Sequence, residues 1–397
     1  MKRCLAAFLL IAALMGCATE EQPPTVAAPP VLPPVLPFDQ AVENAAVAVL
    51  SVNHAAVSST RVIVIDPLVD GVTGEQSVAT RQIGARIAAL VGQRFPNYRI
   101  EPFSAASVAQ RPLVMVGTFT AVNAQNQTAG ERAAYRFCLV LADLDNGRVA
   151  AKSVSRAELQ GVDASPAGLF RQSPIWSEDP ATRSYVNTCQ TTRAGDPVPA
   201  PYLAGIEAAA LVQEAAVEFE AERYLAALGK YQAARQTSAG DQLRVHNGLY
   251  LTNRRLRREA AASEAFDRLV DYGLEHQRLA VKLLFRPGTT AFAEGPDTVG
   301  EYPRWLRSIA RQAGARTTCL EVRGHTSSSG ATALNERLSA QRAETVRTLL
   351  VAENPSLGSR VIATGAGSRE ALIGTGRDDL SDLLDRRVEF RVVTNCG

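Results

Sequence analysis

Residues 323–343 read RGHTSSSGATALNERLSAQRA, and they decide the fold of the C-terminal part of the chain. An apolar run ends at this stretch, a loop of glycine and small hydroxyl residues follows, and the rest has the composition of a helix. Four helical residues lie at offsets of zero, three, four and seven: Asn335, Leu338, Ser339 and Arg342. Because these offsets share one helix face, the stretch predicts a strand, a polar loop and a helix that presents an arginine.

The sequence on either side extends this unit into a domain. Apolar runs predict four strands, at 281–287, 319–325, 360–367 and 386–395. Residues 302–312 predict an amphipathic helix with Trp305 and Ile309 on its inner side. The order β-α-β-α-β-loop-β gives one compact sheet covered by helices.

Five motifs follow one another in this part of the chain: LFRPGTTAF, RGHTSSSG, NERLSAQRAETV, ATGAGSRE and DRRVEFRV. In order and spacing they resemble the OmpA-like peptidoglycan-binding domain. The resemblance covers residues 281–397, under a third of the chain. It implies a βαβαβ-β sandwich of sheet and helices, with peptidoglycan as the binding partner.

The resemblance also implies which residues bind. In that family the polar loop and the helix hold the diaminopimelate side chain of the stem peptide, which carries an ammonium and a carboxylate on one carbon. Arg342 would clamp the carboxylate through two hydrogen bonds, which lysine cannot reproduce. Asn335 would brace the loop, and Leu338 would pack beneath it. The other ligand-binding residues implied are Thr326, Ser327 and Arg386.

One residue departs from the family pattern. Ser327 stands where the family usually has an aspartate that accepts hydrogen bonds from the ligand ammonium. A hydroxyl carries no charge, so a charge-assisted contact of about 1.5–3 kcal/mol is lost. Three alternatives stay open: hydroxyl and backbone groups suffice, Asp385 supplies the charge, or the ligand has changed. Structural roles also remain, namely a helix-capping turn for Ser327 to Ser329, a loop brace for Asn335 and a surface ion pair for Arg342.

Residues 1–16 have the pattern of an export signal. Lys2 and Arg3 precede the apolar run CLAAFLLIAALMG, which at 13 residues is too short to span a bilayer. The sequence LMGC that ends at Cys17 resembles the lipobox of bacterial lipoproteins, which implies cleavage before Cys17 and acylation of its thiol and new amine. Ala18 follows in place of aspartate, and the enteric sorting rule then implies the outer membrane. An ordinary signal peptide with an incidental cysteine is the alternative.

Residues 17–37 are expected to form a lipidated tether. The segment PPTVAAPPVLPPVLP, residues 23–37, holds seven prolines. Such a segment prefers extended polyproline II geometry, which rises about 3.1 Å per residue and gives a reach of roughly 45 Å. Placed after a lipid anchor, it would hold the folded part away from the membrane. The alternative is a proline-motif ligand for another domain.

Residues 38–200 mix helix and strand patterns and predict an α/β domain with a mixed sheet. Helices are predicted at 38–50 and around 83–91, strands at 61–68 and 112–122, and a hairpin at 135–157 around Asp145-Asn146-Gly147. The domain faintly resembles small α/β domains of envelope lipoproteins that assist curli export, flagellar assembly or cell-wall synthases. The segment IDPLVDGVTG, with Asp66, Asp70 and Gly71, is interpreted as a turn, because it lacks the pattern of a phosphate loop.

Residues 201–280 become rich in alanine and predict helices. Three positions recur after 35 residues: Ala227, Tyr231 and Ala234 are matched by Ala262, Phe266 and Leu269. This period and the A-x-x-x-[YF] pattern resemble tetratricopeptide helix pairs, and a generic helical hairpin is the alternative. The arginine cluster at 254–258 is interpreted as a solvated helix face.

Four cysteines remain if Cys4 leaves with the signal and Cys17 carries lipid. They divide two and two between 38–200 and 281–397, which favours Cys138–Cys189 and Cys319–Cys396 among three possible pairings. Four buried thiols are the alternative. If the strands that begin at Cys319 and end at Cys396 are antiparallel neighbours, a disulfide there would stabilise the domain by about 4 kcal/mol.

Composition and motifs exclude several function classes. Without Lys2 and Arg3 the 42 basic residues become 40, equal to the 40 acidic ones, so no overall charge attracts nucleic acid. The cysteines and four histidines lack metal-ligand spacing, and no cofactor is expected. A catalytic Cys/His pair, a G-x-S-x-G motif and a recognisable pair of carboxylates are all missing, so an enzyme such as a wall hydrolase is not expected.

The leading hypothesis is an outer-membrane lipoprotein, facing the periplasm, that links the membrane to peptidoglycan without a covalent bond. Two weak attachments at opposite ends would gain from effective concentration. The second hypothesis is an assembly or regulatory factor. In it, residues 38–280 recruit an envelope machine or wall synthase, and the C-terminal domain only localises the protein.

Overall fold

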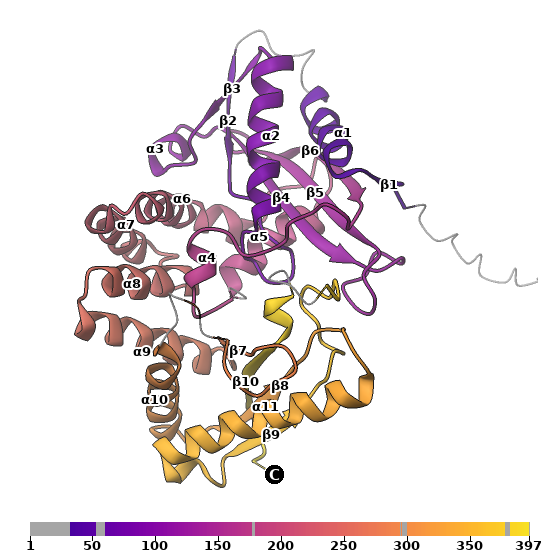
Figure 1. Cartoon of the computed structure of the whole chain (residues 1–397). Coiled ribbons are helices and arrows are strands. Elements are labelled where there is room, and N and C mark those ends of the chain that lie inside the picture. The colour runs from indigo at the N-terminus through magenta and orange to yellow at the C-terminus, as the bar shows by residue number, and fades with distance from the viewer. Residues whose placement is uncertain are drawn as a thin grey trace, which may run out of the picture. The chain divides into compact units, whose positions relative to one another are not determined.

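Two mixed β-sheets organise the chain in the computed structural model (Figure 1). The structure describes residues 32–52, 60–176, 179–293, 295, 300–377 and 382–396, and the part from Pro33 onward is one compact unit. The mixed α/β class predicted from the sequence is confirmed. Within these ranges, no helix combines the length and the apolar character needed to cross a membrane. The predicted export signal and Cys17 lie outside the described residues.

The N-terminal sheet has six strands in the order β1-β6-β5-β4-β2-β3. Their bounds are β1 (Val35–Leu36), β2 (Arg61–Ile65), β3 (Tyr98–Glu101), β4 (Leu113–Val122), β5 (Ala134–Asp143) and β6 (Arg148–Ala157). β2 is parallel to β3 and β4, whereas β4, β5 and β6 form an antiparallel meander. The predicted β5–β6 hairpin is confirmed, and Gly147 in its turn has a φ of 68°, which glycine adopts without strain.

Helices cover both faces of this sheet. α1 (Phe38–Ser51) and α2 (Val78–Arg94) contribute to one hydrophobic core, and α5 (Pro180–Gln190) and α6 (Ala200–Glu220) contribute to the other. The short helices α3 (Ala105–Val108) and α4 (Leu169–Gln172) lie in connections. Every residue of β4 is buried, with Met115 in the first core and Val116 in the second. The continuous apolar sequence of this strand follows from its position between the two helical layers.

The predicted tether is shorter than the sequence indicated, because its last residues belong to the sheet. Val35 and Leu36 form β1, which pairs parallel with Arg156 and Ala157 of β6. The N–H of Glu158 also donates to the carbonyl of Leu36 at 2.9 Å. Val35 and Leu36 lie between prolines but keep the backbone N–H groups that a strand needs. The end of the predicted tether is therefore a short edge strand within a proline-rich segment.

Four successive helices make up the helical segment. α6 is followed by α7 (Tyr224–Gln236), α8 (Leu243–Arg255) and α9 (Glu259–Glu275). All six residues that recur with the period of 35 are buried, three in α7 and three in α9. The period read from the sequence therefore marks the core positions of two helix pairs.

The turns of the two helix pairs also repeat. Glu222 and Arg257 both adopt left-handed backbone conformations, with φ of 60° and 56°. In each turn the N–H of the next residue, Arg223 or Arg258, donates at 2.9 Å to a carbonyl five residues earlier. In the arginine cluster at 254–258, the first two arginines end α8 and the other two belong to the second turn. The cluster is largely exposed, as predicted, but only part of it lies on a helix.

The C-terminal sheet has four strands in the order β7-β10-β8-β9. Its elements are β7 (Arg278–Leu284), α10 (Glu301–Gly314), β8 (Cys319–Gly324), α11 (Thr332–Glu353), η2 (Pro355–Leu357), β9 (Val361–Gly365), η3 (Leu383–Asp385) and β10 (Arg387–Val393). This is the predicted β-α-β-α-β-loop-β order. Trp305 and Ile309 of α10 are buried, as their spacing indicated.

One hydrophobic core joins the helical segment to the C-terminal sheet. It runs from Tyr231 and Phe266 to Trp305 and Phe390. The predicted domain boundary at residue 280 falls inside β7, which is a strand of this core. Lys282 of β7 also forms an ion pair with Glu75 of the N-terminal domain, and both side chains are buried. The C-terminal domain is therefore packed firmly against the residues that precede it.

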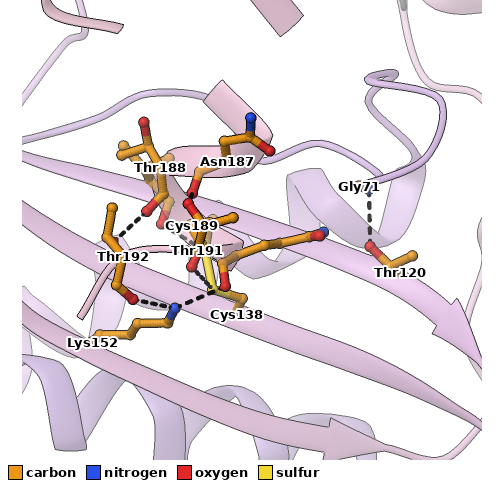
Figure 2. Close-up of a disulfide and its surroundings, with 12 residues drawn as sticks. Gly71, Thr120, Cys138, Lys152, Asn187, Thr188, Cys189, Thr191 and Thr192 are labelled. Atoms are coloured by element: carbon orange, nitrogen blue, oxygen red, sulfur yellow. Dashed lines mark hydrogen bonds between the residues drawn. A yellow bond between two sulfur atoms is a disulfide. The ribbon is translucent and has the colours of Figure 1, made fainter. Parts of the chain in front are cut away.

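Two disulfides connect the cysteine pairs that the division between residues 38–200 and 281–397 favoured. Cys138 of β5 joins Cys189 of α5 with a Cα–Cα distance of 6.1 Å, which ties the helix to the sheet (Figure 2). Lys152 of β6 lies nearby, and its Nζ donates to the carbonyl of Thr192 at 2.6 Å (Figure 2). Cys319 joins Cys396 with a Cα–Cα distance of 5.2 Å. β8 and β10 are antiparallel neighbours, as that pairing required.

Candidate functional site

Asn335 holds the polar loop between β8 and α11. Its Nδ2 donates to the carbonyl of Ser329 at 2.9 Å and to that of Ser327 at 3.4 Å. The Oγ atoms of these two serines are 3.0 Å apart. Asn335 is buried in the first turn of α11, so it braces the loop from below.

Arg342 lies two turns farther along α11, and its side chain is completely buried. Nε donates to the carbonyl of Thr289 and Nη2 to that of Arg286, each at 3.0 Å. Nη1 donates to the carbonyl of His325 at 2.9 Å. The guanidinium lies over the ring of Phe285, 5.1 Å from its centroid. The alternative of a surface ion pair is therefore wrong, because this arginine is buried and donates hydrogen bonds to three backbone carbonyls.

The two donors on one edge of Arg342 decide what it can bind. Nε and Nη2 form an edge that can grip both oxygens of a carboxylate. Two carbonyl oxygens of the segment 286–289 occupy this edge in the structure. These carbonyls stand where the carboxylate oxygens of a ligand would lie, so a ligand reaches Arg342 only if the segment moves aside.

The hydroxyl groups of the loop differ in their access to solvent. Thr326 and Ser327 are 2% and 4% exposed, whereas Ser328 is exposed. The N–H of Thr326 donates to the carbonyl of Gly367 at 2.9 Å, and its Oγ1 has no hydrogen-bond partner in the described part of the chain. The N-cap of α11 is Ala331, with no side-chain hydrogen bond. The predicted alternative of serines that cap the helix is therefore wrong.

Leu338 and Arg386 occupy supporting positions. Leu338 is half-buried on α11. Arg386 is buried just before β10, and its carbonyl accepts the N–H of Phe285 at 2.9 Å. Because Phe285 lies under the guanidinium of Arg342, the backbone of Arg386 helps to position the surface on which that guanidinium rests.

Asp385 does not replace the carboxylate missing at Ser327. Its Oδ1 accepts the N–H groups of Leu372 and Ile373 at 2.6 and 3.0 Å, and its Oδ2 accepts that of Gly374 at 2.7 Å. The side chain is completely buried. Both carboxylate oxygens thus accept backbone hydrogen bonds within one turn. The alternative in which Asp385 binds the ligand ammonium is therefore wrong, and its role is structural.

A network of arginines and glutamates on β8 and β10 was missed in the sequence analysis. Glu389 is buried and pairs with Arg387 at 3.2 Å and with Arg391 at 2.8 Å. Across the ladder it lies opposite Arg323, which pairs with Glu370 at 2.6 Å. Burial raises the pKa of Glu389, but the neighbouring positive charges and the His325 ring outweigh burial and hold it below its ordinary value. The R-x-E-x-R alternation at 387–391 was the available signal, because alternate residues share one strand face.

His325 of the G-H-T motif is buried beside this network. Its Nε2 is 3.6 Å from Oε1 of Glu389, which is longer than a hydrogen bond. Burial and the charge of Arg387 lower its pKa to about 4, so the ring is neutral at neutral pH. Donor atoms of His325, Glu370 and Glu389 lie within 4.8 Å of one another, which is close enough for a shared metal ion. The arginines already neutralise both glutamates, so the geometry is that of an ion-pair network.

The segment IDPLVDGVTG forms the predicted turn. Oδ1 of Asp70 accepts the N–H groups of Val72 and Thr73 at 2.9 and 2.8 Å. The N–H of Gly74 closes the turn by donating to the carbonyl of Asp70 at 2.9 Å. The Asp70 carboxylate therefore serves the backbone, and the cation or phosphate loop is not the structure adopted.

Comparisons with known proteins give a family match at the C-terminal end. Residues 284–379 match the model of the OmpA family. Curated protein sequences gave no match. Among solved structures, the C-terminal domain of Helicobacter pylori MotB is similar, with 19% identity over 29% of this chain and 84% of that chain, and a TM-score of 0.24.

Two further solved structures are similar to the same degree. The peptidoglycan-associated lipoprotein from Burkholderia pseudomallei has 21% identity over 28% of this chain and 89% of that one, with a TM-score of 0.24. A putative MotB like protein from Desulfovibrio vulgaris has 21% identity over 37% of this chain and 98% of that one, with a TM-score of 0.25. The family match confirms what the five motifs indicated: the chain carries an OmpA-family domain at residues 284–379.

Proposed function

We propose that the chain binds peptidoglycan through its C-terminal domain and is anchored in this way to the cell wall of the bacterial envelope. The observation that carries the proposal is the OmpA-family match over 284–379, which includes the loop braced by Asn335 and the helix with Arg342. The domain shares its core with the helical segment, and Lys282 pairs with Glu75. Attachment of this domain to the wall would therefore hold the whole unit from Pro33 onward.

The ligand is the diaminopimelate side chain of a stem peptide. Its carboxylate takes the Nε–Nη2 edge of Arg342 in place of the carbonyls of Arg286 and Thr289. A carboxylate adds the charge of the acceptor to that of the guanidinium and binds it through two parallel hydrogen bonds, whereas a backbone carbonyl is a neutral acceptor, so this exchange favours the ligand. The bond from Nη1 to the carbonyl of His325 and the contact with Phe285 keep the guanidinium oriented during the exchange.

The ligand ammonium meets neutral acceptors in this chain. In the loop, Ser328 is exposed, Ser329 is half-buried and Ser327 is buried. Hydroxyl and carbonyl oxygens accept hydrogen bonds from an ammonium, but they do not neutralise its charge. We therefore expect a weaker site than one with a carboxylate at position 327.

A lipid anchor at Cys17 completes the proposal. The protein would lie at the outer membrane and face the periplasm, with acyl chains in lipid at one end and the wall-binding domain at the other. Both disulfides fit an oxidising compartment. Two attachments on one chain raise the effective concentration of each, so a weak pocket suffices. The role is one of binding, and it requires no cofactor and no catalytic step.

Isothermal titration of residues 33–397 with two soluble stem peptides tests the ligand. One peptide carries diaminopimelate, and the other carries lysine, which lacks only the carboxylate assigned to Arg342. We expect the diaminopimelate peptide to bind at least tenfold more tightly, and Arg342→Lys to remove this preference. Arg337→Ala, at an exposed position of the same helix, is the matched control. Equal affinity for both peptides would refute the proposed site.

A second role is the recruitment of an envelope protein through residues 38–280. The observation that favours it is the extent of this region, which has a six-stranded sheet with two hydrophobic cores and lies outside the family match. A chain that served only as an anchor would not need such a region. Photo-crosslinking from exposed positions of α7 in cells tests this role, and crosslinks to peptidoglycan alone would exclude it.

A further inference from the structure

A cavity of about 310 Å³ lies where the N-terminal sheet, α5 and α6 meet α8 and α9. Eight of the side chains around it carry polar groups: Asp66, Tyr185, Tyr202, Asp241, Gln242, Arg244, Tyr272 and His276. The volume lies at the lower end of the range of about 300–1,000 Å³ that is typical of small-molecule sites. Wall binding by the C-terminal domain makes no use of this cavity.

Asp66 brings a carboxyl group to the cavity at a favourable place in the sheet. It follows β2, the middle one of three parallel strands, at their carboxyl end. Ligands of α/β sheets commonly bind at that edge. Asp66 is 3% exposed, and its Oδ2 accepts the hydroxyl of Tyr202 at 2.8 Å. Burial raises the pKa of Asp66 to about 7, against the lowering effects of Tyr202 and Arg244.

Arg244 of α8 brings the opposite charge to the same cavity. Its Nη2 donates to the carbonyl of Gly74 at 3.1 Å, while its Nε is buried and has no hydrogen-bond partner among the described residues. Arg244 and Asp66 also line a second cavity of about 30 Å³, so the two groups stand on a wall shared by both spaces. A buried donor without a partner costs free energy, and a ligand acceptor would recover it.

The rest of the cavity wall is largely apolar and leaves room. Gly205 and Ala209 lie one turn apart on α6 and give that side little side-chain bulk. A Cβ added at Gly205 would come no closer than 4.0 Å to the Cβ of Ala239. On the opposite helix the rings of Tyr272 and His276 stack with centroids 4.0 Å apart. If Asp66 and Arg244 served only to stabilise the fold, they would need no open volume beside them. A ligand site does need such a volume.

We propose that this cavity binds a free amino acid, with its carboxylate on Arg244, its ammonium on Asp66 and its side chain along the rings of Tyr272 and His276. The two opposite charges at the site select a zwitterion. A simple carboxylate would bring its charge next to ionised Asp66, and a simple amine would bring its charge next to Arg244. When Asp66 is protonated, it releases its proton as the ammonium binds.

Isothermal titration of residues 33–397 with L- and D-phenylalanine and with leucine tests the ligand class. Two half-analogues separate the charges, because 3-phenylpropionate lacks the ammonium and phenethylamine lacks the carboxylate. We expect saturable binding of at least one amino acid, with each half-analogue bound at least tenfold more weakly. The proposal is overturned if no amino acid binds at millimolar concentration, or if one half-analogue binds as tightly as the amino acid.

Variants place the ligand in the cavity. Arg244→Gln and Asp66→Asn should each weaken binding at least tenfold, whereas Arg255→Gln, at an exposed position of the same helix outside the cavity, should not. Gly205→Leu fills the space from α6 and leaves both charged groups in place. It should abolish binding without lowering the melting temperature, because leucine is also a better helix former than glycine. Unchanged affinity in Gly205→Leu would overturn the assignment.

The pH dependence identifies Asp66 as the group that meets the ammonium. The titratable and charged groups around it are Tyr185 on α5, Tyr202 on α6, Arg244 on α8, Tyr272 on α9 and, elsewhere on the cavity wall, Asp241 and His276. Burial raises the pKa of both Tyr185 and Tyr202 well above the ordinary value of 10, so they stay neutral. The ionised fraction of Asp66 falls about tenfold from pH 8 to pH 6, and amino-acid affinity should fall by about the same factor. The variant His276→Gln should keep this pH dependence of affinity, whereas Asp66→Asn should lose it. If the affinity of the unmodified chain does not change with pH, the assignment of Asp66 is contradicted.

Discussion

The loop above Arg342 and the cavity beside Asp66 both hold a buried arginine nitrogen, but the two arginines are in opposite states. Arg342 donates from Nε, Nη1 and Nη2 to three backbone carbonyls. Arg244 donates from Nη2 to one carbonyl, and its Nε has no partner within the described chain. The family motif therefore marks a site that the chain's own backbone has closed. The unmet Nε of Arg244 lies in a region outside the family match.

The two arginines show that a sequence motif and an unmet polar group give different information about a ligand site. A motif identifies residues that act together, but it does not reveal whether their hydrogen bonds are already satisfied within the chain. Unmet polar groups beside an open volume indicate a ligand without any motif, because burial of such groups is costly. The stability of the first site should therefore depend on its arginine, whereas the second site should respond to pH and to ligand.

The largest expected effect is the loss of stability in Arg342→Ala. Three carbonyls would lose their donor, that of His325 in a buried position, and the face of Phe285 would lose its covering group. We expect the free energy of unfolding of residues 33–397 to fall by about 3–5 kcal/mol in urea titrations. The exposed control Arg337→Ala should change it by less than about 0.5 kcal/mol. A loss below about 1 kcal/mol for Arg342→Ala would show that the segment 286–289 is held by other contacts.

The next effect is the pH dependence of stability in Asp66→Asn. The pKa of Asp66 is raised from 3.8 to about 7, so between these values the unfolded chain loses its proton before the folded chain does. Folding is therefore progressively disfavoured as pH rises from about 4 to 7, by up to about 4 kcal/mol at pH 8. Asp66→Asn removes this penalty, so its melting temperature should exceed that of the unmodified chain at pH 8 and approach it at pH 5. Parallel pH profiles for the two proteins would contradict the buried-acid account.

A smaller effect is expected when the family carboxylate is restored. Ser327→Asp should supply the charged acceptor that the loop lacks, which is worth about 1.5–3 kcal/mol in binding. The affinity for the diaminopimelate stem peptide should rise at least tenfold in isothermal titration. Ser328→Asp, at the neighbouring exposed position, is the matched control. An equal gain from both variants would indicate general attraction of the ammonium instead of a specific contact.

The smallest effect concerns the repeated turns of the helical segment. Glu222 and Arg257 hold left-handed conformations that cost side-chain-bearing residues about 1–2 kcal/mol. Glu222→Gly and Arg257→Gly should each raise the free energy of unfolding by about 1 kcal/mol or less, because glycine avoids the steric cost but loses more chain entropy. Similar gains in both would support equivalent turns. A gain in one and a loss in the other would refute this equivalence.

Local periodicity made much of the fold predictable from the sequence. Alternating and continuous apolar runs located β2, β4 and the β5–β6 hairpin, because strand burial directly selects those residues. The 35-residue period located Tyr231 and Phe266 in the helical core for the same reason. Val35 and Leu36 escaped prediction as a strand, since the prolines around them dominate the composition and the partner strand lies far away in the chain.

Sites that depend on distant residues were harder to predict. The motif located Asn335 and Arg342 on one helix face, but the carbonyls that occupy Arg342 come from another part of the chain. The role of Asp385 depends on a turn more than ten residues away in the sequence. The cavity joins Asp66 to Tyr202 and Arg244, and nothing in a local pattern brings these three together.

The most direct test of wall binding is co-sedimentation of residues 33–397 with purified sacculi. Sacculi with diaminopimelate should be compared with sacculi that have lysine in its place, for the unmodified chain and for Arg342→Lys and Arg337→Ala. We predict that the unmodified chain and Arg337→Ala sediment with diaminopimelate sacculi only, and that Arg342→Lys stays in the supernatant. Two results would contradict the assigned role of Arg342 in binding the cell wall. In one, Arg342→Lys sediments with diaminopimelate sacculi to the same extent as the unmodified chain. In the other, the unmodified chain sediments equally with both kinds of sacculi.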